Sequence, residues 1–112
     1  MKCCEIWQID LNPTVGAEIK KSRPCIIVND DAVGILPLRV IVPLTEWNAR
    51  YNSADWMVKI APDGKNRLTK PSAADCFQVR SVSTNRFLDK IGEITAVDFD
   101  EIKRALQVVF NL

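Results

Sequence analysis

The clearest pattern along the chain is an alternation of apolar and polar residues near its beginning. Trp7, Ile9 and Leu11 fall on one face of this stretch, with polar residues between them. A period of two is typical of a half-buried β-strand. The sequence therefore predicts a strand over residues 5–11, which turn-forming residues at 12–16 (NPTVG) bring to an end.

Turn residues divide the middle of the chain into further short apolar runs. These runs are rich in β-branched residues, which favours strands over helices. Pro43 lies inside one of them and predicts an edge strand or a bulge, because proline cannot donate a ladder hydrogen bond. The predicted strands cover residues 24–29, 38–44, 56–60 and 74–82, and residues 91–94 end the β region.

The last segment has a helical period instead. Thr95 with Asp98 predicts a capping box at its start, and Asp100 is placed to pair with Arg104 one turn later. Short strands followed by one amphipathic helix predict a mainly β fold, a small barrel or sandwich, with a C-terminal helix on the sheet. The apolar residues that recur at helical spacing are Phe99, Ile102, Leu106, Val109 and Phe110.

Length and composition fit one domain, which we expect to span residues 1–112. With 47% hydrophobic and 26% charged residues, the composition is that of a globular protein and argues against disorder. The net charge of +1 argues against a uniformly basic protein, although a local basic groove suffices to bind nucleic acid. No apolar run is as long as a membrane span or a signal peptide requires, so we expect a cytoplasmic protein without membrane contact.

The four cysteines, Cys3, Cys4, Cys25 and Cys76, raise the question of a metal site. Their spacing is poor for zinc, because two are adjacent, no CxxC pair exists and the chain has no histidine. Reduced, mostly buried thiols of a cytosolic protein are the better interpretation. We therefore expect neither a metal nor another cofactor.

The absence of histidine also narrows the possible enzyme chemistry. It excludes histidine-based acid–base pairs and Ser-His-Asp triads, and no GxxxxGK[ST] or GxGxxG motif is present. RNA cleavage remains compatible, because RNA supplies its own nucleophile, the 2′-hydroxyl. Such an enzyme must align the phosphate, move two protons and stabilise the charge on phosphorus, for which arginine is well suited.

Three blocks of sequence resemble the MazF/PemK toxin family, and with the terminal helix that ends in Ala105 and Leu106 the resemblance covers nearly the whole chain. They are residues 10–24 (DLNPTVGAEIKKSRP), residues 41–45 (IVPLT) and residues 78–82 (QVRSV) with Arg86. The resemblance implies an SH3-like small β-barrel of the plasmid-maintenance toxin type. It also implies a homodimer that binds single-stranded RNA across its interface, cleaves it to a cyclic phosphate and a 5′-hydroxyl without a metal, and is blocked by a cognate antitoxin.

The same resemblance assigns candidate roles to individual residues. Arg23 and Thr45 are the catalytic candidates. Arg23 would contact the scissile phosphate, where it could either stabilise charge or also serve in proton transfer, and Thr45 would hydrogen-bond the phosphate. The alternatives are a surface arginine that begins a strand and a strand-end threonine without a chemical role. The candidate RNA-binding residues are Glu18, Lys20, Lys21, Gln78 and Arg80.

The RNA-binding candidates have structural alternatives too. Lys20 and Lys21 could steer RNA or simply belong to a solvated loop. Glu18 could cap a turn or pair with Arg23. Gln78 and Arg80, predicted to share one face of a strand, could read unpaired bases or face solvent. Tryptophans and Phe77 are more often core or interface residues, and Trp47 is the best candidate for a base platform.

Two positions depart from the family pattern. Phe77 stands just before the glutamine, where the family often has aspartate, and Asp75 is predicted to share a strand face with it. Cys4 and Glu5 replace a common Gly-Asp pair. The first departure keeps an alternative open, a non-catalytic module of the same fold that binds a protein target such as DNA gyrase. A degenerate member that acts as a decoy or repressor is a third possibility.

Overall fold

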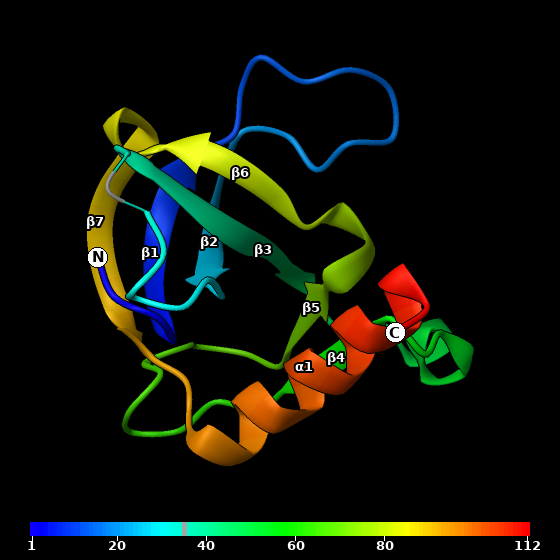
Figure 1. Ribbon diagram of the computed structural model, residues 1–112. Coiled ribbons are helices and arrows are strands. Elements are labelled where there is room, and N and C mark those ends of the chain that lie inside the picture. The colour runs from blue at the N-terminus through cyan, green and yellow to red at the C-terminus, as the bar shows by residue number, and fades with distance from the viewer. Residues whose placement is uncertain (35) are drawn as a thin grey trace.

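Within residues 1–34 and 36–112, which this computed structural model describes, seven antiparallel strands form one strongly curved sheet with a helix against it (Figure 1). The strands are β1 (Glu5–Asp10), β2 (Ser22–Ile27), β3 (Leu38–Glu46), β4 (Met57–Ile60), β5 (Ser72–Asp75), β6 (Arg80–Ser83) and β7 (Phe87–Glu93). The helices are the 3-10 turns η1 (Ala49–Ser53), η2 (Cys76–Gln78) and η3 (Thr84–Arg86), and the helix α1 (Ala96–Phe110).

The long strand β3 connects the two halves of the sheet. The strand order is β4-β5-β3-β2-β1-β7, and β6 also pairs with β3. On one edge β3 pairs with β6 as far as Ile41 and with β5 from Leu44 onward. Pro43 lies between these two registers, so no neighbour on that edge needs its missing N–H. The predicted edge or bulge is wrong, because β3 is central and Pro43 pairs regularly with Cys25 of β2.

The fold class predicted from the sequence is confirmed, although the sheet does not close on itself. Strands β4 and β7 end the strand order and, among the described residues, do not pair with each other. The loop after β4 covers the gap, because the Glu93 amide donates a hydrogen bond of 3.1 Å to the Lys65 carbonyl oxygen. Gly92 lies so close to this loop that a Cβ would be 2.6 Å from the carbonyl oxygens of Lys65 and Asn66.

Both faces of the central strands are buried, which explains the uninterrupted apolar run at residues 25–28. Along β2, Ile26 belongs to the apolar cluster beneath α1, whereas Cys25 and Ile27 belong to a second cluster on the other face. The helix contributes Ile102 to the first cluster. Strands buried on both faces show continuous rather than alternating hydrophobicity.

The helix α1 begins as predicted. The Thr95 hydroxyl oxygen accepts a hydrogen bond of 3.2 Å from the Asp98 amide, which is the N-cap interaction. The predicted ion pair between Asp100 and Arg104 is wrong, because Asp100 pairs with Lys103 and Arg104 with Glu101. These pairs are three residues apart, a spacing that also places side chains together on a helix.

The predicted strand over residues 74–82 is wrong as a single element. Strand β5 ends at Asp75, whose carboxylate accepts a hydrogen bond of 3.2 Å from the Phe77 amide and caps the turn η2. Strand β6 begins only at Arg80. The last strand is longer than predicted, because β7 pairs with β1 from Phe87 onward.

No helix in the described residues is long and apolar enough to cross a membrane.

Candidate functional site

Arg23 and Thr45 lie side by side at one end of β2 and β3. These strands pair with Cys25 opposite Pro43, and extending that register by two residues puts Arg23 opposite Thr45. Both residues are half-buried, and both line a recess of about 360 Å³. The structure thus brings together the two residues that the sequence predicted to be catalytic.

Lys70 and Glu46 also line this recess. Lys70 Nζ lies 3.5 Å from Glu46 Oε2, and both side chains are largely exposed. Ser72 of β5, opposite Glu46, is a further lining residue. Sequence reasoning missed these residues because none lies inside a motif block. The recess therefore contains two cationic residues, Arg23 and Lys70, beside one carboxylate.

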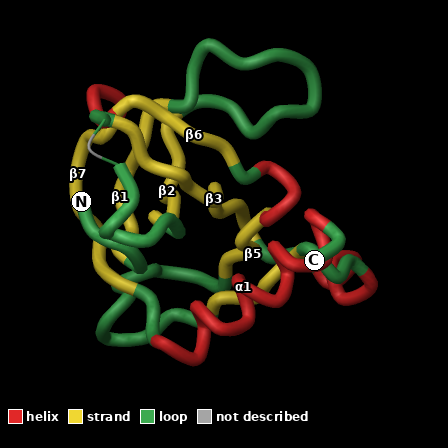
Figure 2. The backbone as a smooth tube through the Cα atoms, viewed as in Figure 1, coloured by secondary structure: helices red, strands yellow, loops and turns green. Residues whose placement is uncertain are grey.

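The loop between β1 and β2, residues 11–21, extends beyond the strands and carries the predicted lysines (Figure 2). The side chains of Lys20 and Lys21 are exposed. The Lys20 carbonyl oxygen accepts a hydrogen bond of 3.3 Å from Arg23 Nε. The loop is therefore attached to the catalytic candidate through its backbone, while its two lysine side chains face solvent.

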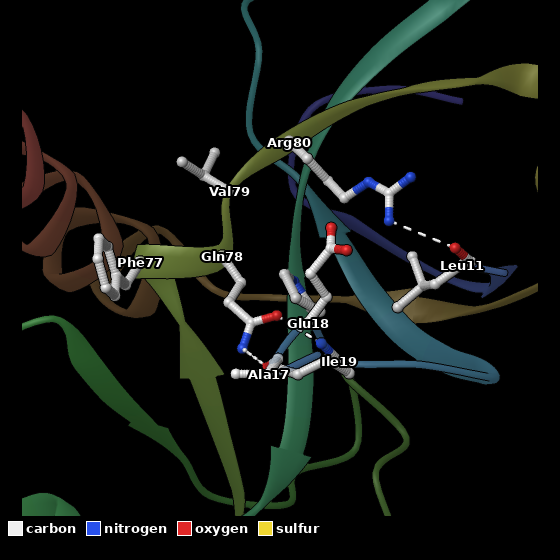
Figure 3. Close-up of a pocket in the computed structure, with 9 residues that line it drawn as sticks. Leu11, Ala17, Glu18, Ile19, Phe77, Gln78, Val79 and Arg80 are labelled. Atoms are coloured by element: carbon white, nitrogen blue, oxygen red, sulfur yellow. Dashed lines mark hydrogen bonds between the residues drawn. The ribbon is translucent and has the colours of Figure 1, made fainter. Parts of the chain in front are cut away.

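Glu18 caps a turn within this loop. Its Oε1 accepts a hydrogen bond of 2.6 Å from the Val15 amide, and its own amide donates to the Val15 carbonyl oxygen over 3.2 Å. Of the two alternatives that the sequence left open, turn capping is the one observed. Glu18 lines a different recess of about 380 Å³, together with Gln78 and Arg80 (Figure 3).

Gln78 and Arg80 do not share a strand face, so that prediction is wrong. Gln78 ends η2, whereas Arg80 begins β6. Both side chains bind the backbone near the β1–β2 loop. Gln78 Oε1 accepts from the Ile19 amide over 2.6 Å, and Arg80 Nη1 donates to the Leu11 carbonyl oxygen over 3.3 Å. In this structure both residues hold the loop.

Arg86 binds the same end of β1. Its Nη1 donates to the carbonyl oxygens of Asp10 and Asn12. The third sequence block of the family resemblance, residues 78–82 with Arg86, is therefore hydrogen-bonded to the first block, residues 10–24. This contact explains physically why the two blocks belong together although about sixty residues separate Gln78 from Ile19.

Asp75 and Phe77 lie in opposite environments, contrary to the predicted shared strand face. Asp75 is only 7% exposed and Phe77 is 70% exposed. Burial raises the pKa of the Asp75 carboxyl, although hydrogen bonds from Phe77 and Gln78 act in the other direction. The exposed Phe77 ring instead meets Trp56 edge to face, with ring centroids 6.1 Å apart.

The two recesses lie near each other along β3, where Pro43 lines one and Thr45, two residues further on, lines the other. One recess offers Arg23, Lys70 and a threonine hydroxyl, which are suitable ligands for a phosphate. The other is mostly apolar, with Glu18, Gln78 and Arg80 also among its lining residues, and such surroundings suit a small planar molecule. Side by side, they can accommodate a charged backbone and an adjacent apolar group.

Comparison with known proteins gives consistent matches over the whole chain. Residues 2–110 match the family described as PemK-like, MazF-like toxin of type II toxin–antitoxin system. Endoribonuclease MazF9 of Mycobacterium tuberculosis is 29% identical over 118 aligned positions, covering 100% of this chain and 98% of the relative. Endoribonuclease EndoA of Bacillus subtilis is 26% identical, covering 96% of this chain and 92% of that protein.

Solved structures share the fold at lower sequence identity. MazF from Deinococcus radiodurans superposes with a TM-score of 0.81 at 16% identity, over 100% of this chain and 97% of the other. A mycobacterial endoribonuclease in complex with its cognate antitoxin gives a TM-score of 0.79 at 19% identity, over 100% and 96% of the two chains. The family match together with these whole-length similarities shows that this chain belongs to the PemK-like, MazF-like toxin family of type II toxin–antitoxin systems.

Proposed function

We propose that this protein is an endoribonuclease that cleaves single-stranded RNA at selected sequences without a metal ion. The observation that carries the proposal is the placement of Arg23 beside Thr45 in one recess with Lys70. Two relatives that this chain matches over nearly their full lengths are named endoribonucleases, which agrees with the enzyme class predicted from the sequence.

The reaction uses the substrate's own nucleophile. The RNA 2′-oxygen attacks the adjacent phosphorus and gives up its proton, the bond from phosphorus to the 5′-oxygen breaks, and that oxygen takes up a proton. The products are a 2′,3′-cyclic phosphate and a 5′-hydroxyl end. Negative charge on the phosphoryl oxygens grows in the transition state, so fixed hydrogen-bond donors aimed at them accelerate the step.

Arg23 and Thr45 supply such donors. A guanidinium presents several N–H groups in a fixed plane that matches phosphate oxygens, and it stays charged throughout the neutral pH range. We therefore assign charge stabilisation to Arg23 and a hydrogen bond to the same phosphate to Thr45. Exposed Lys20 and Lys21, on the loop attached to Arg23, would attract the RNA backbone.

The test is cleavage of a long, mixed-sequence RNA in excess EDTA, with mapping of the new ends. We expect discrete cuts with 5′-hydroxyl and cyclic phosphate ends. Arg23→Ala should abolish them, and Arg23→Lys should also lose most activity, because an ammonium lacks the planar fork. Arg104→Ala on α1, far along the chain and paired with Glu101, is the matched control that should cleave normally.

Intact RNA with a folded wild-type protein would contradict the proposal, and so would full activity in folded Arg23→Ala. Activity that appears only after a divalent cation is added would contradict metal independence alone. Each of the three variants changes one exposed or half-buried side chain, so we expect all of them to fold, and circular dichroism checks this.

We also propose a homodimer and a cognate antitoxin as partners. Two findings support these partners. The chain belongs to a family of toxin–antitoxin systems, and the mycobacterial endoribonuclease that shares its fold was solved in complex with its cognate antitoxin. The exposed aromatic pair Trp56 and Phe77 is a suitable apolar surface for protein contact. Sedimentation velocity measures the oligomeric state directly, and a monomer at micromolar concentration would contradict the dimer.

A further inference from the structure

The β1–β2 loop is held by separate hydrogen bonds at its base and along its outer part. At its base, the Leu11 amide donates to the Lys21 carbonyl oxygen over 3.0 Å, and the Lys21 amide donates to Asn12 Oδ1 over 3.1 Å. These bonds join the two ends of the loop to each other. They do not connect the outer part of the loop, residues 13–20, to the body of the protein.

Gln78 makes that connection with both ends of one amide group. Its Oε1 accepts a hydrogen bond of 2.6 Å from the Ile19 amide, and its Nε2 donates one of 3.2 Å to the Ala17 carbonyl oxygen (Figure 3). Two bonds from one planar group to one backbone segment fix both the position and the direction of that segment. The loop residues around Glu18 are thereby held against the turn η2.

Asp75 determines which way round this amide lies. Its buried carboxylate accepts from the Phe77 amide through Oδ1 and from Gln78 Nε2 through Oδ2, over 3.3 Å. A carboxylate accepts hydrogen bonds and does not donate them when ionised. The nitrogen of the Gln78 amide must therefore face Asp75, which leaves the oxygen for the Ile19 amide.

The held segment leads directly to Arg23. Lys20 follows Ile19, and its carbonyl oxygen accepts a hydrogen bond from Arg23 Nε over 3.3 Å. A guanidinium with one N–H fixed to a positioned carbonyl has fewer orientations than one that extends into solvent. The position of Ile19 and the orientation of the Arg23 side chain are therefore linked through two adjacent backbone groups.

We propose that Gln78, oriented by Asp75, is a positioning residue that latches the β1–β2 loop and thereby aligns Arg23 for the cleavage proposed above. The latch rests on that proposed function only for its catalytic consequence; the loop contact exists without it. Its loss should lower kcat, because the arginine is less well preorganised, and should change KM much less.

The first experiment measures the loop without reference to activity. Amide hydrogen exchange of Ile19 is followed by NMR in wild type, in Gln78→Ala and in Gln78→Glu, which keeps the side-chain length but cannot donate to Ala17. We expect exchange of the Ile19 amide to be at least about tenfold faster in both variants, because its acceptor is lost or its partner bond is broken. The amides of Leu11 and Lys21 serve as internal controls and should keep their protection.

The second experiment measures cleavage of a short RNA that contains the mapped site. In Gln78→Ala and in Asp75→Asn we expect kcat to fall by about tenfold or more with KM changed less than about threefold. Gln107→Ala and Asp89→Asn, which alter exposed side chains on α1 and β7, are the matched controls and should leave both constants unchanged.

The outcomes separate the latch from the proposed function. Faster Ile19 exchange in the Gln78 variants supports the latch even if the wild type leaves RNA intact, and in that case only the endoribonuclease assignment fails. Unchanged Ile19 exchange overturns the latch. An altered cleavage motif with raised KM and unchanged exchange also overturns it, because Gln78 would then read a base and not hold the loop.

Discussion

The Trp7 indole donates a hydrogen bond of 2.8 Å to Glu5 Oε1 within β1. The two residues lie on the same face of the strand, and Lys90 of β7 approaches the other carboxylate oxygen, Oε2, to 3.3 Å. Burial alone would raise the pKa of Glu5, but the hydrogen bonds from Trp7, the Lys2 backbone, Lys90 and the N-terminal amine together outweigh it and lower that pKa from 4.5 to about 2. A charged carboxylate that is buried and fully bonded in this way stabilises the pairing of β1 with β7.

This relationship predicts a pH-dependent contribution to stability. Because the pKa of Glu5 is lower in the folded chain, its contribution is complete above its usual pKa of 4.5 and is lost as pH falls toward 2. Glu5→Gln should lower the free energy of unfolding by about 2 kcal/mol at pH 7 and by about half as much at pH 3, which lies between the two pKa values. Urea unfolding of wild type and variant at both pH values measures this difference in the free energy of unfolding. If the variant loses the same free energy at both pH values, the charge of Glu5 is not the cause.

Gly92 predicts a large effect from one added methyl group. A Cβ there would lie 2.6 Å from two backbone oxygens, which cannot move aside as a flexible side chain could. Gly92→Ala should therefore destabilise the protein by about 3 kcal/mol or more. Gly64→Ala is the matched control, because a Cβ at Gly64 has no heavy atom within 4 Å. Thermal unfolding of both variants tests the difference, and similar melting temperatures would refute it.

Thr45 allows the hydroxyl to be removed without a change in shape. Thr45→Val keeps the β-branched side chain that suits a strand and lacks the hydrogen-bond donor. We expect kcat for RNA cleavage to fall by about tenfold to a hundredfold, with the melting temperature nearly unchanged. Thr69→Val in the exposed loop before β5 is the control. Wild-type kcat in Thr45→Val would remove Thr45 from the mechanism.

Lys20 and Lys21 should affect RNA binding through charge alone. With a 2′-O-methyl RNA that cannot be cleaved, the slope of log affinity against log salt should become shallower by about 0.7 for each lysine replaced by alanine. Lys103→Ala, on α1 and paired with Asp100, should leave the slope unchanged. An unaltered slope in the double variant would mean that these lysines belong to a solvated loop.

The sequence predicted those elements in which one face is buried, because burial of one face gives a regular spacing of apolar residues along the chain. Helix α1 follows from its apolar spacing, and Thr95 at its N-cap follows from local side-chain chemistry that requires no tertiary contact. The register of β2 with β3 could not be read from the sequence. The sequence blocks 10–24 and 41–45 nevertheless contained Arg23 and Thr45, the two residues that this register places opposite each other.

The failures arise where side chains bind backbone groups. Alternation continues through residues 74–82, yet the Asp75 carboxylate caps a turn there, and residues 76–79 lie outside the strands. A pattern of hydrophobicity does not report such a bond. The same limit concealed the role of Gln78, because its partners, Ala17 and Ile19, are about sixty residues away along the chain.

The pairing of β1 with β7 also has a consequence for synthesis of the chain. Ile6 pairs with Gly92, so the outer edge of β1, the first strand to be synthesised, is covered only after β7, the last strand, has been made. The recess of Arg23 and Thr45 depends on β2, which is anchored on that first strand. We therefore expect nascent and prematurely terminated chains to lack the ordered recess, which would delay any harmful activity until translation of the toxin itself is complete.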